Sequence, residues 1–274
     1  MTGRANAPAA KQTEARSSSS TGPDKSGKVR PKSGIVMLES AFDRESDDDV
    51  IVKNQRSPRP KDAATLILVR RDGPAPRVLM GKRSGGHAFM PDKYVFPGGR
   101  VDPEDSRAIS WCELRPDVEA KLRIQARRLP RAFALTAIRE TFEETGLLVA
   151  RPAEMPAAAP KGWAPFHELD AAPHLSPLTF IGRAITPPYR PRRFDARFFM
   201  ADAEEALIDE RPPVDGAELS DLQWVTLADA AGLDLPNVTR FMLNEIDARL
   251  KAKDYRDGPP FLRWTRSGHS TERL

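Results

Sequence analysis

Cysteine is scarce in this chain, and its scarcity bears on how the fold is stabilised and on the compartment in which the protein is found. Cys112 is the single cysteine in 274 residues, so no internal disulfide can form, and the composition fits a reducing compartment. Long apolar runs are missing too. The longest, Ala63–Val69, is interrupted by Thr65 and is far shorter than the roughly 20 residues that a membrane span needs. Residues 1–10 contain no apolar core resembling a signal peptide. We therefore expect a cytoplasmic protein that does not cross a membrane.

Histidine is scarce as well, which argues against a zinc site. The four histidines are scattered, and none has the spacing that zinc ligands show. They are His87, His167, His174 and His269.

Positive charge is concentrated at the N-terminus. Residues 1–33 hold seven Lys and Arg against two acidic residues, so 7 − 2 = +5; the whole chain is +4, and residues 34–274 therefore sum to −1. Basic tails are usually solvated. The pI of about 9.3 is thus a property of the tail, and nucleic acid is not expected as a partner.

The distribution of turn-forming and apolar residues divides the chain into three parts. Residues 1–57 are rich in Ser, Lys, Pro, Gly and Asp and lack periodicity, which predicts a disordered tail. Residues 58–266 hold the periodic segments and are expected to form one domain, followed by a C-terminal tail at 267–274. Strands are predicted at 63–70, 77–83, 94–96, 178–184, 193–200, 221–225 and 261–264, and helices at 117–128, 131–144, 227–231 and 237–250. The first two strands are expected to pair as a hairpin. Strands and helices without strict alternation predict an α+β domain, an α/β/α sandwich with helices on both sides of a sheet.

The most informative stretch is the predicted helix at 131–144, which is followed by Gly146. Apolar side chains fall on one stripe of this helix, whereas Glu140, Glu143 and Glu144 gather on the opposite face. Three carboxylates that close repel one another unless a cation lies among them. Oxygen ligands of this kind suit Mg²⁺ or Mn²⁺, which also hold substrate phosphates. The alternative is a solvated acidic face, and the residues upstream decide between the two.

Upstream, Gly98 and Gly99 directly follow a predicted strand, in the run Phe-Pro-Gly-Gly-Arg-Val-Asp at 96–102. Glycine lets a backbone approach another chain or a ligand closely. Together with Arg-Glu-Thr-Phe-Glu-Glu-Thr-Gly-Leu at 139–147, this turn resembles the Nudix box, whose family pattern is G-x5-E-x7-R-E-U-x-E-E-x-G-U, with U an apolar residue.

The chain departs from this pattern in three ways. Asp105 stands where the family has its first glutamate, and Thr141 occupies the first apolar position. Between Asp105 and Arg139 there are 138 − 105 = 33 residues in place of seven. Residues 106–130 carry Val118, Leu122 and Leu129 at helical spacing and are expected to form an inserted helical segment.

A box with such an insertion, together with the segments at 89–99 and 192–199, is similar to a Nudix subgroup that includes mammalian peroxisomal coenzyme A diphosphatases and bacterial relatives. The resemblance implies the Nudix fold, a mixed sheet between helices. It also implies magnesium-dependent hydrolysis of a phosphoanhydride bond in a nucleoside diphosphate linked to another moiety, with coenzyme A or acyl-CoA as one candidate. ADP-ribose, NADH or another nucleotide is the alternative substrate, and a non-catalytic ligand-binding regulator is the alternative function.

Candidate site residues follow from the resemblance and from side-chain chemistry. The expected metal ligands are Glu140, Glu143 and Glu144; the catalytic candidates are Arg139, Glu140, Glu143 and Glu218; the substrate-binding candidates are Arg83, Gly98, Gly99, Arg193 and Arg197. Arg139 is expected to orient Glu140 or Asp105, while Glu218 is either a general base on a loop or an ordinary surface acid. Guanidinium forks fit phosphates, but Arg193 and Arg197 could equally form a structural ion cluster around Asp195. The expected partner is a small nucleotide-diphosphate molecule, and a homodimer is left open.

Overall fold

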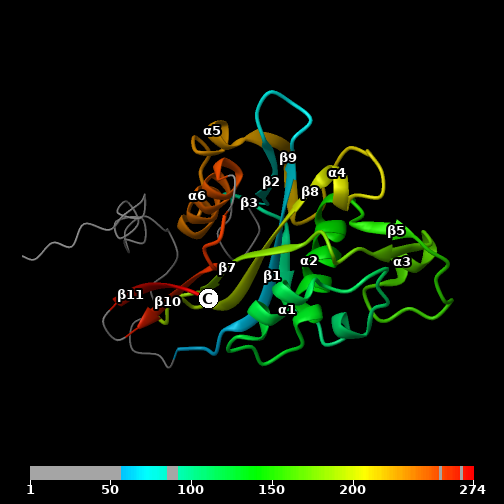
Figure 1. The fold of residues 1–274 in the computed structure, drawn as a ribbon, viewed down its shortest axis with the longest axis horizontal. Coiled ribbons are helices and arrows are strands. Elements are labelled where there is room, and N and C mark those ends of the chain that lie inside the picture. The colour runs from blue at the N-terminus through cyan, green and yellow to red at the C-terminus, as the bar shows by residue number, and fades with distance from the viewer. Residues whose placement is uncertain (1–56, 85–91, 253–254, 266–267) are drawn as a thin grey trace, which may run out of the picture. The chain divides into compact units, whose positions relative to one another are not determined.

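The computed structural model describes residues 57–84, 92–252, 255–265 and 268–274. The tail predicted at 1–57 therefore lies outside the described residues, apart from Ser57. The described elements form a mixed sheet of nine strands with helices on both of its faces (Figure 1). This arrangement confirms the α+β sandwich expected from the sequence. No helix within the described ranges has the length and apolar character needed to cross a membrane.

The large sheet runs in the order β11-β10-β7-β8-β1-β2-β3, with β4 paired to β1 and β9 paired to β2. Its strands are β1 (Lys61–Arg70), β2 (Arg77–Arg83), β3 (Tyr94–Val95), β4 (Gly98–Arg100), β7 (Thr179–Ile185), β8 (Phe194–Asp202), β9 (Leu219–Thr226), β10 (Pro260–Thr265) and β11 (Gly268–Arg273). A separate pair joins β5 (Ala150–Pro152) to β6 (Ala171–Pro173). The helices are the 3₁₀ helix η3 (Asp105–Arg107), α1 (Pro116–Arg123), α2 (Pro130–Thr145), α3 (Ala164–Glu168), α4 (Ala203–Ala206), α5 (Leu227–Ala230) and α6 (Asn237–Lys251).

Strand β1 lies inside the sheet and supplies side chains to two cores. Its residues Ala64, Leu66 and Leu68 pack with residues of α2, whereas Ile67 and Val69 pack with residues of α6. Successive strand residues point to opposite faces, so one strand can serve both cores. Because both faces are covered, the stretch from Ala63 to Val69 is apolar apart from Thr65, with no polar alternation. In Figure 1, α2 and α6 lie on opposite sides of β1.

The pairing of β1 differs from the hairpin that the sequence predicted. β1 meets β2 only at the two residue pairs nearest the turn. Its long partner is β8, which runs parallel to it over nine consecutive pairs beginning with Lys61↔Phe194. β2 instead pairs along most of its length with β9. The hairpin prediction was wrong beyond the turn, because local turn signals cannot reveal a partner that lies 194 − 61 = 133 residues further along.

The inserted segment at 106–130 contains one α-helix, as expected, but that helix is short. α1 ends at Arg123 rather than at 128, and Gln125 follows with a φ of 52°. Val118 and Leu122 are buried in the core shared with α2. Leu129, expected on the same apolar stripe, is 56% exposed because the helix has ended before it.

The C-terminal tail expected at 267–274 is wrong where the structure describes it. Gly268–Arg273 form β11, which pairs antiparallel with β10 through six residue pairs. Its side chains are polar on both faces, so no apolar alternation marks it as a strand. Backbone pairing holds it instead, together with a cross-strand ion pair of Arg263 with Glu272 at 3.1 Å.

The position of β1 between two cores gives a stability prediction. Leu66→Ala removes a fully buried side chain and should lower the free energy of unfolding by about 2–5 kcal/mol. Leu169→Ala, at a side chain that is 47% exposed, should change it by less than about 0.5 kcal/mol. Chemical denaturation measures both values, and equal losses would contradict the central placement of Leu66.

Candidate active site

Helix α2 carries the acidic face, and local sequence sets both of its ends. Pro130 occupies the first turn, where its missing N–H has no helical partner to lose. Gly146 ends the helix in the left-handed conformation with a φ of 72°. The helix predicted at 131–144 is thus confirmed to within one residue at each end. Residues 132–138 are all buried, so the packed first half of α2 fixes the acidic second half relative to β1 and β4.

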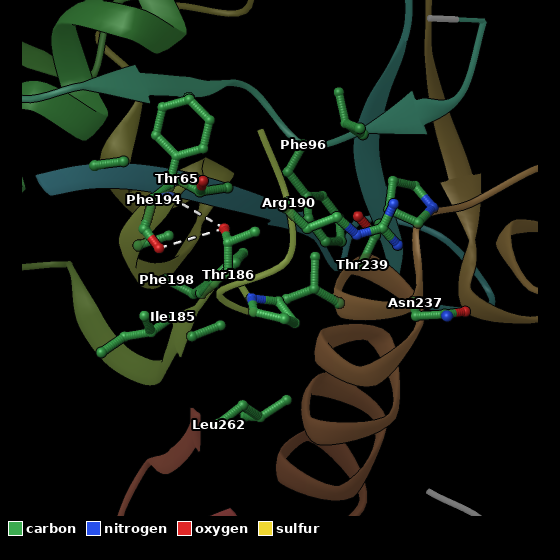
Figure 2. A pocket seen from close by; sticks show the side chains of 18 of the residues that line it. Thr65, Phe96, Ile185, Thr186, Arg190, Phe194, Phe198, Asn237, Thr239 and Leu262 are labelled. Carbon is green, nitrogen blue, oxygen red and sulfur yellow. Dashed lines mark hydrogen bonds between the residues drawn. The ribbon is translucent and has the colours of Figure 1, made fainter. Parts of the chain in front are cut away.

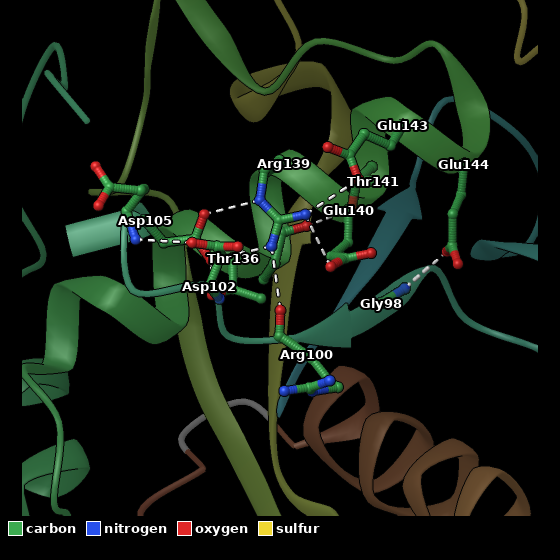
Figure 3. A network of polar contacts seen from close by, with 12 residues as sticks. Gly98, Arg100, Asp102, Asp105, Thr136, Arg139, Glu140, Thr141, Glu143 and Glu144 are labelled. Carbon is green, nitrogen blue, oxygen red and sulfur yellow. Dashed lines mark hydrogen bonds and ion pairs between the residues drawn. The ribbon is translucent and has the colours of Figure 1, made fainter. Parts of the chain in front are cut away.

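The charged centre of the site is Asp105, which is fully buried in η3. Arg139 reaches it with two nitrogens, Nε to Oδ1 at 2.7 Å and Nη2 to Oδ2 at 3.0 Å (Figure 3). The Thr136 hydroxyl donates to Asp105 at 2.6 Å, and the Trp163 indole N–H donates at 3.2 Å. The backbone N–H of Asp102 adds a further bond at 2.9 Å. These donors replace the water that a buried carboxylate loses. Asp105 therefore reaches Arg139 despite its short side chain and the insertion.

The same guanidinium also orders the acidic face of α2. Arg139 Nη1 donates to Glu140 at 2.8 Å and to Glu143 at 3.0 Å. Burial disfavours the charge of Arg139, but the neighbouring carboxylates outweigh this effect and raise its pKa above the usual value. Arg139 is 7% exposed and faces carboxylates, as the sequence predicted.

The glycine turn lies directly against this acidic face. The Gly98 N–H donates to Glu144 Oε2 at 2.9 Å. A Cβ at Gly99 would lie 2.5 Å from the carboxyl carbon of Glu140, and a Cβ at Gly98 would lie 2.5 Å from the backbone carbonyl oxygen of Ala64. No larger residue fits at either position without a shift of its neighbours.

Burial disfavours ionisation on the acidic face. It raises the pKa of Glu140 to about 7 and the pKa of Glu144 to about 8. The pKa of Glu143 is also raised, first by burial, although its side chain is 44% exposed. Several carboxylates with raised pKa values in one place favour a cation, because positive charge restores their ionised forms.

The donor chemistry of this face fits a hard divalent cation. Glu140, Glu143 and Glu144 offer carboxylate oxygens, which Mg²⁺ and Mn²⁺ prefer. In their present directions the first two face Arg139 and the third faces Gly98. As they stand, therefore, no three or more His, Cys, Asp or Glu side chains in the part of the chain that the structure describes are grouped to hold a metal ion. The three carboxylates are thus of a type that fits Mg²⁺ or Mn²⁺, while in this structure Glu140 and Glu143 are paired with Arg139.

A cavity of about 180 Å³ lies on the α6 face of the sheet and reaches the glycine turn (Figure 2). Its walls are largely apolar and aromatic, and include Phe96, Phe194, Phe198 and Leu262. Arg83, Gly98 and Gly99, three of the predicted substrate-binding residues, line it. The charge of Arg83 also lowers the pKa of Glu144 against the larger effect of burial, which places that guanidinium near the acidic face. The glycine turn is thus the border between the acidic face and the cavity.

Several cavity residues were missed in the sequence. Arg190 lines the cavity and is 4% exposed, and Tyr189 lines it beside Arg190. Both lie in Pro-Pro-Tyr-Arg-Pro at 187–191, between two predicted strands. An arginine and an aromatic residue in a proline-rich connection were the available signal. Asn237 and Thr239 line the cavity from the first turn of α6, where the sequence carries no such signal.

Two of the arginines predicted to bind substrate lie elsewhere. Arg197 is 1% exposed, pairs with Asp195 at 2.7 Å and has its guanidinium carbon 4.1 Å from the ring centre of Phe133 on α2. Strand alternation explains this position, because β8 turns its even-numbered residues toward the cavity. Arg193 donates to the backbone carbonyl of Pro58 at 2.9 Å and does not line the cavity. Neither residue lines the cavity, and Arg197 belongs to an ion cluster with Asp195.

Glu218 lies on an exposed loop beside the acidic face. The loop is joined to the end of α2, where the Val214 N–H donates to the carbonyl of Thr145 at 2.8 Å. In addition to burial, the charge of Glu218 raises the pKa values of Glu143 and Glu144, so it lies near both. This position suits a general base as well as a surface acid.

Known proteins resemble this chain in sequence and in fold. No family model matches the chain. It is 28% identical over 178 residues to Nudix hydrolase 7 of Caenorhabditis elegans, covering 60% of this chain and 51% of that protein. It is 28% identical over 209 residues to the human acyl-coenzyme A diphosphatase NUDT19, covering 56% and 54%. The crystal structure of a Nudix hydrolase from Alicyclobacillus acidocaldarius superposes with a TM-score of 0.51 at 28% identity, over 68% of this chain and 90% of that one. The chain is similar to Nudix hydrolases in sequence and in fold.

The chain spans about half the length of the curated relatives that it matches. Its box is split in sequence by the insertion but joined in space by the bonds between Asp105 and Arg139. The residues of the Nudix pattern thus keep their contacts although 33 residues, from 106 to 138, separate two of them.

The buried ion pair gives a stability prediction. Asp105→Asn removes the charge that faces Arg139 and should lower the free energy of unfolding by about 3 kcal/mol or more, because a buried guanidinium loses its main partner. Asp209→Asn, in the exposed pair with Arg211, should cost less than about 1 kcal/mol. Urea denaturation compares the two variants. A cost for Asp105→Asn no larger than for Asp209→Asn would show that this pair does not organise the site.

Proposed function

We propose that this chain hydrolyses a phosphoanhydride bond in a nucleoside diphosphate linked to another moiety, with Mg²⁺ or Mn²⁺ as its cofactor. The observation that carries the proposal is the contact between the acidic face of α2 and the turn at Gly98 and Gly99, at the border of a cavity. Similarity to known proteins supports the same reaction, since one matched relative is named a hydrolase and another a diphosphatase.

Glu140, Glu143 and Glu144 are the proposed metal ligands. A divalent cation held by them would neutralise phosphate oxygens, polarise the phosphorus and lower the pKa of the attacking water. Arg139 is a positioning residue in this scheme, because it contacts two of these carboxylates from the side of Asp105 and does not line the cavity.

The remaining residues bind the substrate and move the proton. Arg83 is proposed to contact a phosphate, since it lines the cavity and lies near Glu144. Glu218, on the loop, is proposed as the general base. Glu143, on the helix, is the alternative general base. The apolar walls behind Gly98 and Gly99 suit the moiety that the diphosphate carries.

Coenzyme A or an acyl-CoA is the first substrate to test, because the human relative is an acyl-coenzyme A diphosphatase. ADP-ribose and NADH offer the same diphosphate with a different moiety. A non-catalytic regulator is disfavoured, since the chain retains Glu140, Glu143 and Glu144. With a single cysteine in 274 residues, we place this activity in the cytoplasm as part of the same proposal.

The metal assignment predicts a large loss of turnover in Glu144→Gln. Metal stabilisation of the transition state is worth several kcal/mol, and each 1.4 kcal/mol is tenfold in rate, so kcat should fall by about 100-fold or more. Glu154→Gln, at an exposed acid away from the site, should retain full activity. Release of phosphomonoester in the presence of Mg²⁺ measures both, and added EDTA should abolish the wild-type rate. Unchanged turnover in Glu144→Gln would refute its role as a metal ligand.

The cavity geometry separates two arginines that look alike in sequence. Arg83→Ala should raise KM by about tenfold or more, because a hydrogen bond to a charged group is worth about 1.5–3 kcal/mol. Arg193→Ala, outside the cavity, should leave KM within about twofold of wild type (tenfold is about 1.4 kcal/mol). Initial-rate kinetics on both variants test the assignment, which fails if the two arginines affect KM equally.

A further inference from the structure

The C-terminal hairpin of β10 and β11 forms one wall of the cavity. Leu262 and Arg263 of β10 and His269 of β11 line it. Thr239, in the first turn of α6, lines it next to them, and Figure 2 shows Leu262 and Thr239 bordering the same space. The cavity thus joins parts of the chain that are far apart in sequence: Leu262 follows Gly98 by 262 − 98 = 164 residues.

The sheet itself holds this hairpin through few bonds. β10 pairs with β7 at only two positions, Phe261↔Arg183 and Leu262↔Ala184. β11 pairs with β10 and is the last strand in the sheet order of the described residues. Other contacts must therefore set the position of the hairpin.

A buried carboxylate on α6 supplies such contacts. Glu245 is 5% exposed and accepts bonds from Arg249 Nε at 3.0 Å and from the Tyr255 hydroxyl at 2.7 Å. Arg273, the last residue of β11, donates to both of its oxygens, at 2.9 and 3.0 Å. Arg273 also donates to the carbonyl of Gly258, just before β10, at 2.8 Å. Glu245 thus joins the end of the hairpin to the helix whose first turn lines the cavity.

We propose that Glu245 is a positioning residue for ligand binding: it fixes the C-terminal hairpin against α6, and so fixes two walls of the cavity relative to each other. This inference rests on the proposed function, in which the cavity holds the moiety attached to the diphosphate. A shift of one wall relative to the other would weaken binding of that moiety, because cavity sites depend on a largely pre-formed shape.

Aromatic contacts connect the hairpin to a third wall. Trp264 of β10 meets Tyr189 edge to face, with ring centroids 5.4 Å apart, and meets His269 of β11 at 4.7 Å. Tyr189 lines the cavity from the connection between β7 and β8. A shift of the hairpin therefore also moves contacts of the connection that carries Arg190.

The test removes the bond from the hairpin side. In Arg273→Ala, Glu245 keeps two of its three side-chain partners, Arg249 and Tyr255, so we expect α6 to stay folded. We expect KM to rise by about tenfold with kcat within about twofold, because the variant changes binding and leaves the acidic face of α2 intact (tenfold is about 1.4 kcal/mol). Arg273→Lys, which keeps the charge but replaces the planar guanidinium with a single ammonium, should restore part of the wild-type KM. Lys251→Ala breaks an exposed ion pair with Asp247 on the same helix and is the matched control, with no change in KM expected.

Two measurements keep this proposal separable from the hydrolysis itself. One is KM and kcat with whichever of coenzyme A, ADP-ribose and NADH the wild type hydrolyses best. The other is the dissociation constant of AMP without metal, by titration calorimetry. If the wild type hydrolyses none of the three but AMP binds Arg273→Ala about tenfold more weakly, hydrolysis fails and the positioning role stands (tenfold is about 1.4 kcal/mol). If KM and AMP affinity match the wild type while the amides of residues 260–265 exchange faster, the positioning role is overturned.

Discussion

The buried ion pair between Asp105 and Arg139 is the interaction on which the candidate site depends. Asp105 is fully enclosed, and its two oxygens receive the guanidinium, a hydroxyl, an indole N–H and a backbone N–H. Because Arg139 is held there, its remaining nitrogen can direct Glu140 and Glu143 toward the side of the glycine turn. A fully buried carboxylate outside the cavity thus decides where the acidic side chains of α2 lie.

The same pair explains why the box tolerates a long insertion. Residues 106–138 leave and re-enter the site at positions whose side chains are bonded to each other, so the inserted chain is closed at its base. Extending a closed loop costs little conformational entropy, since the cost grows only with the logarithm of its length. Val118 and Leu122 anchor α1 in the core that α2 already provides. The excursion therefore adds structure beside the acidic face without displacing it.

The predictable parts of the molecule are those whose signal is local. The helix predicted at 131–144 and the strand predicted at 77–83 agree with the structure to within one residue at each end. Apolar periodicity marks both elements, and Pro130 and Gly146 mark the two ends of the helix. The short strand β4 and the polar strand β11 escaped because backbone pairing with distant partners, and no apolar pattern, defines them. The acidic triad and glycine turn were recognisable, whereas the substrate role of Arg197 depended on which face of β8 meets the cavity. A sequence shows that successive strand residues point to opposite faces of a sheet, but it does not show which face meets the cavity.

The parallel pairing of β1 with β8 has a consequence for synthesis of the chain. β1 is complete at residue 70, but its main partner begins at residue 194. At about 5–20 residues per second, a ribosome needs roughly 6–25 s to make the intervening chain. During that interval a strand whose Ala63–Val69 stretch is apolar apart from Thr65 has no neighbour along one edge, a condition that favours association with other nascent chains. The insertion, which exceeds the family spacing by 33 − 7 = 26 residues, prolongs this exposure, so chaperone capacity in the producing cell becomes part of what determines the yield of folded protein.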